Sequence, residues 1–130
     1  MIVPDASAAI ELLLRTPTGS RVEARVFSPR VPLHTPHLID VEVAQVLRRY
    51  VVAGAIAPAR GRDALQDLSD MSLIRYSHDV LLERIWQLRD NLTAYDAAYV
   101  ALAEALDAPL LTCDRKLASA AGHRARVEVI

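Results

Sequence analysis

The chain has 130 residues, and its 52% hydrophobic content is ample to fill the core of one domain of common size. The formal net charge of −1 excludes the general positive field that drives non-specific binding to nucleic acids, so any RNA contact has to be local. The single cysteine excludes an intramolecular disulfide and a zinc site made of thiolates.

Strands and helices alternate along the first half of the chain. Pro17 and Gly19 are stop signals for the first helix, and the residues from Ser20 to Glu23 form a capping box that predicts the start of the next one. Pro36 is suited to the first position of a long helix. The predicted elements are a strand over residues 1–4, helices over 7–14 and 20–27, a strand over 31–34 and a helix over 36–54.

The same alternation continues in the second half. Thr93 is a predicted helix cap, and Trp86 falls on the apolar side of its helix with Leu82 and Leu88, where we expect core packing. The predicted elements are helices over residues 58–70, 78–90, 94–106 and 115–121 and strands over 73–76, 109–112 and 127–130. This order is typical of an α/β fold with three layers, in which helices flank a parallel sheet of four to five strands. We expect one domain over residues 1–130.

Charged and apolar residues set further expectations. All but one of the 15 basic residues are arginines, which suit phosphate recognition, although a solvated arginine surface explains any single one equally well. Residues 1–5 lack the features of a signal peptide, and no apolar window reaches about 18 residues, so we expect a cytoplasmic protein without a membrane span. The apolar helices near residues 10–14 and 43–52 are interpreted as a partner interface or as a well-filled core.

Two acids directly follow predicted strands. Asp5 comes after the first strand, and Asp114 comes just after the strand over residues 109–112. Ligand sites of open parallel sheets lie beyond the carboxyl ends of the strands, and acids on neighbouring strands lie about 5–10 Å apart. The alternative is that each acid is a simple helix N-cap.

Two further acids lie on predicted helices. Glu42 interrupts an apolar stripe, so its carboxylate needs a partner, whereas Asp40 lies on the outer side of the same helix. Asp96 lies in the first turn of the helix that follows Thr93. An arginine from another element is the alternative partner for Glu42, and a capping box with Thr93 is the alternative account of Asp96.

Convergence of these acids would require a cation. Several carboxylates in one pocket raise one another's pKa values, and a hard divalent ion keeps them ionised. Oxygen ligands favour Mg²⁺, with Mn²⁺ as a substitute. The histidines show no zinc-binding spacing. His34 and His37 flank Pro36, and we interpret them as ordinary surface or hydrogen-bonded histidines, with a position near the site as the alternative.

Four stretches of the chain resemble one family. They are Asp5-Ala6-Ser7-Ala8, Pro36 followed by Glu42, the run from Tyr95 to Ala103 (YDAAYVALA), and the run from Pro109 to Ala118 (PLLTCDRKLA). Together they span nearly the whole chain, and the last two, at this mutual spacing, are specific. On these residues the chain resembles the PIN-domain ribonucleases, and among them the VapC-type toxins of bacterial toxin-antitoxin pairs.

The resemblance implies a function and a site. It implies that Asp5, Glu42, Asp96 and Asp114 form an acidic metal pocket, supported by Ser7 and Thr112. It also implies magnesium-dependent cleavage of RNA, a homodimer, and a cognate antitoxin that blocks the site.

The chain departs from the family at two positions. Pro4 lies in a strand position that is usually aliphatic, and it removes one hydrogen-bond donor from the sheet. Lys116 replaces an acid found in some relatives, which puts a second metal site in doubt.

Our mechanistic hypothesis assigns a role to each acid. Asp5 and Asp96 are direct metal ligands, Asp114 is a ligand or acts through a water molecule, and Glu42 orients the attacking water or accepts its proton. Arg115, next to Asp114, either contacts phosphate or faces solvent, and the same holds for Lys116.

Two rival functions are compatible with a chain of this length and acidic character. A signalling receiver domain needs a phosphoacceptor aspartate after a central strand near residue 50, and residues 48–55 contain no acid. A catalytically inactive PIN-like module that binds RNA or protein is the other alternative, against which the intact set of four acids argues.

Overall fold

The computed structural model describes residues 1–27 and 29–130, and within them it contains five strands. All pairings between these strands are parallel. A parallel bridge between Ile2 and Leu33 joins the β1-β4-β5 sheet to the β2-β3 pair, so the spatial order is β3-β2-β1-β4-β5. The strands are β1 (Val3–Pro4), β2 (Leu33–Pro36), β3 (Leu73–Tyr76), β4 (Leu110–Thr112) and β5 (Val127–Val129).

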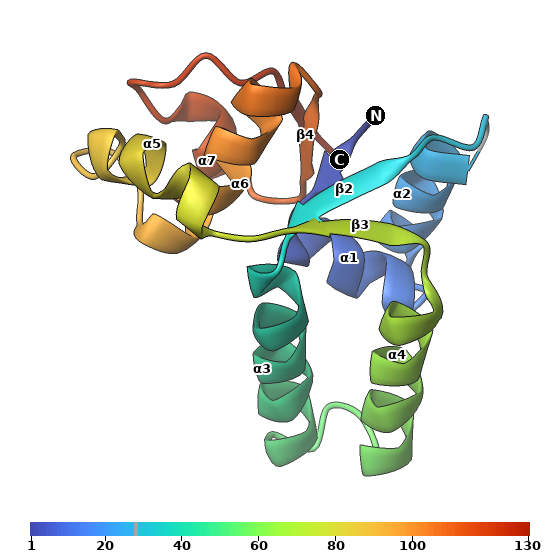
Figure 1. Cartoon of the computed structure of the whole chain (residues 1–130). Coiled ribbons are helices and arrows are strands. Elements are labelled where there is room, and N and C mark those ends of the chain that lie inside the picture. The colour runs from blue at the N-terminus through green and yellow to red at the C-terminus, as the bar shows by residue number, and fades with distance from the viewer. Residues whose placement is uncertain (28) are drawn as a thin grey trace.

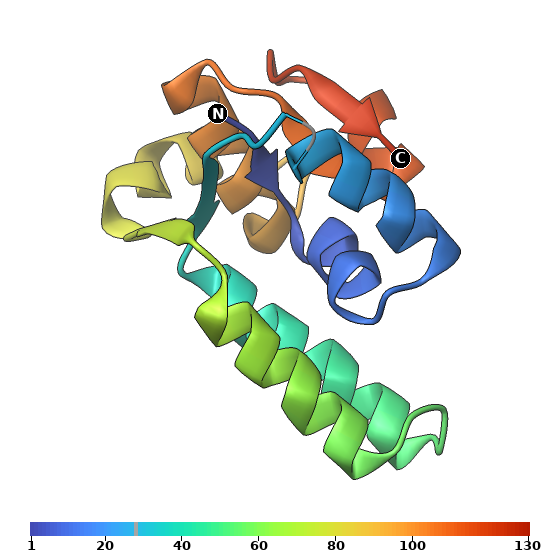
Figure 2. The ribbon, with the colours of Figure 1, turned by 90° about the vertical axis from the view of Figure 1, so that its right-hand side faces the viewer.

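Helices flank this sheet, as the alternating pattern predicts (Figures 1 and 2). Both α1 and α6 pack against β1 and β4, while α3 and α4 lie side by side as a pair that extends away from the strands. The helices are α1 (Ala6–Leu13), α2 (Pro17–Phe27), α3 (Leu38–Val52), α4 (Pro58–Asp70), the 3-10 helix η1 (Asp79–Leu81), α5 (Leu82–Gln87), α6 (Ala94–Leu106) and α7 (Arg115–Ser119).

The proline in β1 explains why only a bridge joins the two parts of the sheet. The backbone N–H groups of Val3 and Asp5 donate toward β4, whereas that of Ile2 donates toward β2. Alternate residues of a strand face the same neighbour, so the nitrogen of Pro4 faces β2. It has no hydrogen to donate, and pairing between β1 and β2 is confined to the bridge at Ile2.

The predicted start of the second helix is wrong. Helix α2 begins at Pro17, and the Thr16 hydroxyl accepts a hydrogen bond from Gly19 N at 2.9 Å, so Ser20 lies inside the helix. Gly19 is a contact residue and not a stop signal, because a Cβ there would lie 2.0 Å from the Glu11 carbonyl oxygen. A threonine cap before a proline outcompetes the capping box at Ser20.

The boundary between β2 and α3 also differs from the prediction. Pro36 is the last residue of β2, paired with Tyr76, and α3 begins at Leu38. The Leu38 N–H donates to His78 Nε2 at 2.9 Å. The helix start is therefore capped by a side chain 40 residues further along the chain, which no local motif reveals.

The region from His78 to Asp90 is less helical than predicted. It holds only η1 and the short α5, and Trp86 is 68% exposed rather than packed in the core. Leu82 is also exposed, whereas Leu88 is buried as expected. The Arg89 guanidinium lies 4.7 Å from the centre of the Trp86 ring, which makes this a surface cation–π pair.

The core accounts for much of the apolar surface noted in the sequence. Ile10 and Leu13 of α1 and Val43 and Leu47 of α3 are buried together, while Val52 at the end of α3 is exposed. Across the part of the chain that the structure describes, no helix is both long and apolar enough to span a membrane.

Candidate active site

Asp5 is buried at the carboxyl end of β1, where a network of hydrogen bonds fixes its carboxylate. Ser7 Oγ donates to Asp5 Oδ1 at 2.6 Å, and the Ala8 N–H donates to the same oxygen at 3.0 Å. Thr112 Oγ1 donates to Asp5 Oδ2 at 2.5 Å. Asp5 is therefore the N-cap of α1, and both side chains that the resemblance implies as supports do contact it.

The same two hydroxyls tie the end of β4 to Asp5. Ser7 Oγ accepts from the Cys113 N–H at 2.9 Å, and Thr112 Oγ1 accepts from the Asp114 N–H at 3.0 Å. The Asp114 carboxylate caps α7 by accepting from the Lys116 N–H and is exposed. The loop that carries Asp114 is thus held against Asp5 through the two hydroxyl groups.

Glu42 is held by a residue that the sequence analysis did not assign to the site. Tyr99 of α6 is 2% exposed, and its hydroxyl donates to Glu42 Oε1 at 2.6 Å. The predicted need for a partner is met by this phenol and not by an arginine. Tyr99 follows Asp96 by three residues, so the helical period of the YDAAY run is the signal that could have placed it on the same face.

Asp96 lies in the first turn of α6 and is partly buried. Its backbone N–H donates to Thr93 Oγ1 at 3.2 Å, so the predicted cap at Thr93 is present. The cap uses the backbone of Asp96, and it therefore does not compete with a further role for the carboxylate.

Electrostatic effects connect all four acids. Burial raises the pKa of the Asp96 carboxyl, and the charges of Asp114 and Asp5 raise it further. Burial also raises the pKa of Glu42, with the Tyr99 hydrogen bond opposing and the charges of Asp96 and Asp5 adding to the increase. The structure thus brings together negative charge from the ends of β1 and β4 and from α3 and α6.

Burial likewise raises the pKa of Asp5, against the lowering effect of its hydrogen bonds from Ser7, Thr112 and Ala8. The pKa of Tyr99 is raised by burial first and by Glu42 second, which keeps the phenol protonated as a donor. A site that disfavours its own ionised form is suited to binding a cation, which relieves the repulsion.

The donor set fits a hard divalent ion that keeps part of its water shell. Among residues 1–27 and 29–130, no three acidic, histidine or cysteine side chains are arranged to hold a metal ion by themselves. Mg²⁺ is commonly bound through one or two carboxylates, with water and substrate phosphate completing the shell. The four carboxylates provide oxygen donors only, which matches this mode.

The other candidate side chains lie elsewhere. Asp40 forms a two-bond ion pair with Arg75 at 2.8 Å, which places it outside the acidic cluster as predicted. His34 is buried and its Nδ1 lies 2.7 Å from the Tyr76 hydroxyl. Arg115 and Lys116 are both exposed.

Comparison with known proteins shows what the chain is similar to. The family model described as PIN domain matches residues 2–123. Ribonuclease VapC9 of Mycobacterium tuberculosis (strain ATCC 25618 / H37Rv) is 43% identical over 130 residues, covering 100% of this chain and 98% of the relative. Ribonuclease VapC12 of the same strain is 42% identical over 130 residues, covering 100% and 99%.

The fold agrees with a solved structure. The crystal structure of PAE2754 from Pyrobaculum aerophilum superposes with a TM-score of 0.72 at 25% identity, covering 98% of this chain and 83% of that one. Family model, relatives and architecture all agree with the resemblance carried by the motifs around Asp5, Asp96 and Asp114. The chain therefore belongs to the PIN domain family, in the branch of that family that contains the VapC ribonucleases.

Proposed function

We propose that the chain is a metal-dependent endoribonuclease toxin that hydrolyses RNA phosphodiesters at Asp5, Glu42, Asp96 and Asp114. The observation that carries the proposal is the proximity of the four acids: besides burial, the charges of Asp114 and Asp5 raise the pKa of Asp96, and those of Asp96 and Asp5 raise the pKa of Glu42. The relatives named ribonucleases, which match over the full length of the chain, support the same activity.

Asp5 and Asp96 are the side chains that would hold Mg²⁺, or Mn²⁺ in its place. When bound, the ion acidifies water and neutralises charge that develops on the phosphodiester. Asp5 offers a carboxylate fixed by three donors, and the pKa of Asp96 is raised by burial and by the charges of Asp114 and Asp5. One carboxylate is thus rigidly placed, and a nearby cation would relieve the repulsion that acts on the other.

Glu42 would orient the attacking water, and Asp114 would be a further ligand of the ion. Tyr99 occupies Glu42 Oε1, and within the described residues no donor reaches Oε2, which leaves that oxygen to orient the water and accept its proton. The raised pKa of Glu42 suits a general base, because its conjugate acid is less acidic than an exposed glutamic acid. Asp114 is exposed and would bind the ion directly or through a water molecule.

We further propose that a cognate antitoxin inhibits the enzyme, that the chain forms a homodimer, and that it acts in the cytoplasm. The similarity to VapC ribonucleases supports these three assignments. Co-expression with the neighbouring gene, followed by size-exclusion chromatography, tests both assemblies. A complex of the two proteins and a dimer of the chain alone are the expected results.

The test of the activity is RNA cleavage by the parent chain, Asp96→Asn and a control, Asp63→Asn, which alters an exposed acid of α4. We expect the parent and the control to cut single-stranded RNA with Mg²⁺ and not with EDTA. Asp96→Asn should lose more than about 100-fold, because supporting residues of metal sites alone account for 10–100-fold. A parent chain that binds RNA and metal without cutting would favour the inactive PIN-like module, and full activity of Asp96→Asn would refute the four-acid site.

A further inference from the structure

A small pocket opens beside the acidic cluster, where the N-terminal ends of α3 and α6 meet α5. Its volume is about 180 Å³. The side chains that line it are mainly apolar or aromatic, and they include Leu38, His78, Leu82, Ile85, Tyr95 and Ala98. The mechanism proposed above uses none of these residues.

The pocket lies one helical turn from the contact between Glu42 and Tyr99. Leu38 precedes Glu42 by four residues on α3, and Tyr95 precedes Tyr99 by four residues on α6. Residues four apart share a helix face, and one turn advances about 5.4 Å. This separation is close to the distance between the phosphate group and the base of one nucleotide.

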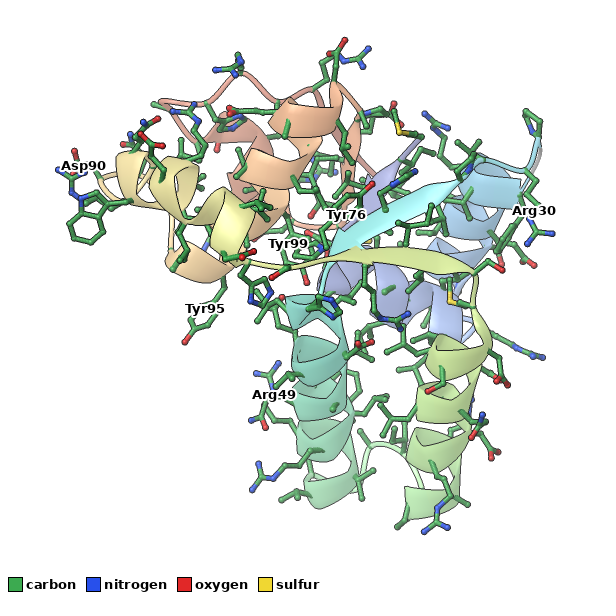
Figure 3. The ribbon with its side chains drawn as sticks, in the orientation of Figure 1. Arg30, Arg49, Tyr76, Asp90, Tyr95 and Tyr99 are labelled. Carbon is green, nitrogen blue, oxygen red and sulfur yellow. The ribbon has the colours of Figure 1, made fainter. Side chains whose placement is uncertain are left out.

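Tyr95 gives the pocket an accessible aromatic side chain. It is 62% exposed, and Figure 3 shows it projecting into open space on the same side of α3 as Arg49. The neighbouring Leu82 is 58% exposed. Exposed apolar side chains of this size, next to a polar reaction site, are suited to hold a flat ligand that is partly removed from water.

His78 adds a polar group to these walls. Its Nε2 accepts the Leu38 N–H at 2.9 Å, so the neutral ring carries its proton on Nδ1. Nδ1 makes no hydrogen bond with the described residues and can donate to an acceptor on a ligand. The pocket therefore combines apolar walls, an aromatic ring and one imidazole donor.

Unpaired RNA bases match this combination, because proteins bind them by stacking on aromatic rings and by hydrogen bonds to their edges. The net charge of −1 and the acidic cluster give RNA no general electrostatic attraction, so affinity has to come from contacts of this kind. We propose that the pocket lined by Leu38, His78, Leu82 and Tyr95 binds an unpaired base next to the scissile phosphodiester. The proposal rests on the ribonuclease function proposed above.

The test measures binding separately from cleavage. In the Asp96→Asn background, fluorescence anisotropy compares labelled single-stranded homopolymer RNAs with an oligomer of the same length that lacks bases. We expect Tyr95→Ala to weaken binding of at least one homopolymer roughly 10-fold, at low and high salt alike, and to leave the base-free oligomer unaffected. Tyr95→Phe should keep the affinity of the parent, because the ring is retained.

Trp86→Ala is the matched control, since Trp86 is an exposed aromatic residue of α5 that does not line the pocket. Its affinity should equal that of the parent. Equal binding by Tyr95→Ala, or an equal loss for RNA and base-free oligomer, would overturn the proposal. A loss of dimer or of antitoxin binding in Tyr95→Ala, with RNA affinity unchanged, would assign the pocket to a protein partner instead.

Cleavage assays distinguish this failure from failure of the proposed function. With the catalytic acids intact, Tyr95→Ala should raise KM roughly 10-fold and change kcat by less than about twofold. A parent chain that cuts no RNA would refute the ribonuclease, whereas a cutting parent with an unaffected Tyr95→Ala variant would refute only the base pocket.

Discussion

The two halves of the acidic site are built in different ways. At the strand ends, Asp5 receives hydrogen bonds from Ser7, Ala8 and Thr112, and the hydroxyl groups of Ser7 and Thr112 also hold the loop after β4. On the helices, Glu42 is held by a single hydrogen bond, from Tyr99. The strand-end half is thus fixed by hydrogen bonds among the adjacent ends of β1 and β4 and the start of α1, whereas the helical half depends on how α3 and α6 pack together.

Removing a support from the strand-end half should have the largest effect. In Thr112→Val the hydroxyl that donates to Asp5 and accepts from Asp114 is lost, while the shape of the buried side chain is kept. We expect a 10–100-fold loss of kcat/KM, the range found when supports of metal ligands are removed. Thr18→Val is a control at a partly buried threonine away from the site, and it should retain parent activity.

Tyr99→Phe tests the helical half. It removes the one hydrogen bond to Glu42, and we expect a loss of about 10-fold in kcat. Because that hydrogen bond lowers the pKa of Glu42, its loss should move the acid limb of the pH–rate profile to higher pH. Tyr50→Phe, a partly buried tyrosine of α3, should leave both quantities unchanged. An unshifted profile in Tyr99→Phe would mean that Glu42 is held by packing alone.

Replacing Asp96 should increase stability although it lowers activity. The pKa of Asp96 is raised above its usual 3.8 in the folded chain, so its ionised form opposes folding, and this cost appears as the pH rises through the raised value. In EDTA at pH 7, Asp96→Asn should therefore raise the melting temperature by a few degrees. The gain should disappear below the usual pKa of Asp96, and a gain that persists there would point to another cause.

The smallest effect should come from the ion pair that anchors α3 to β3. Arg75→Met breaks the contact with Asp40, which lies outside the acidic cluster and is partly exposed. We expect a loss of stability of about 0.5 kcal/mol in urea titrations and a change of less than about twofold in kcat. A large loss of activity would show that this pair, and not Tyr99, sets the position of Glu42.

The same contrast explains what could be predicted from the sequence. Asp5 and Asp114 follow directly from strand ends, and the parallel sheet follows from the alternating pattern, so both were accessible to local reasoning. The bond from Tyr99 to Glu42 spans 57 positions of the chain. No local pattern encodes such a contact, which arises only when two helices pack.

The errors have a similar origin. The cap of α3 by His78 and the exposure of Trp86 depend on how the segment around η1 lies against the rest of the molecule. At Pro36 the strand extends further than predicted, because pairing with Tyr76 on β3 outweighs the local preference of proline for a helix start. Local helix signals therefore failed where long-range contacts competed with them.

The most direct test of the central claim is metal binding itself. Electron paramagnetic resonance of Mn²⁺ titrated into the parent chain, Asp5→Asn, Asp96→Asn and the control Asp63→Asn measures the site without any requirement for substrate. The four-acid account predicts that the parent and Asp63→Asn bind Mn²⁺ alike, and that Asp5→Asn and Asp96→Asn each lose more than about 100-fold in affinity. Parent-like Mn²⁺ binding by both of these variants would contradict it.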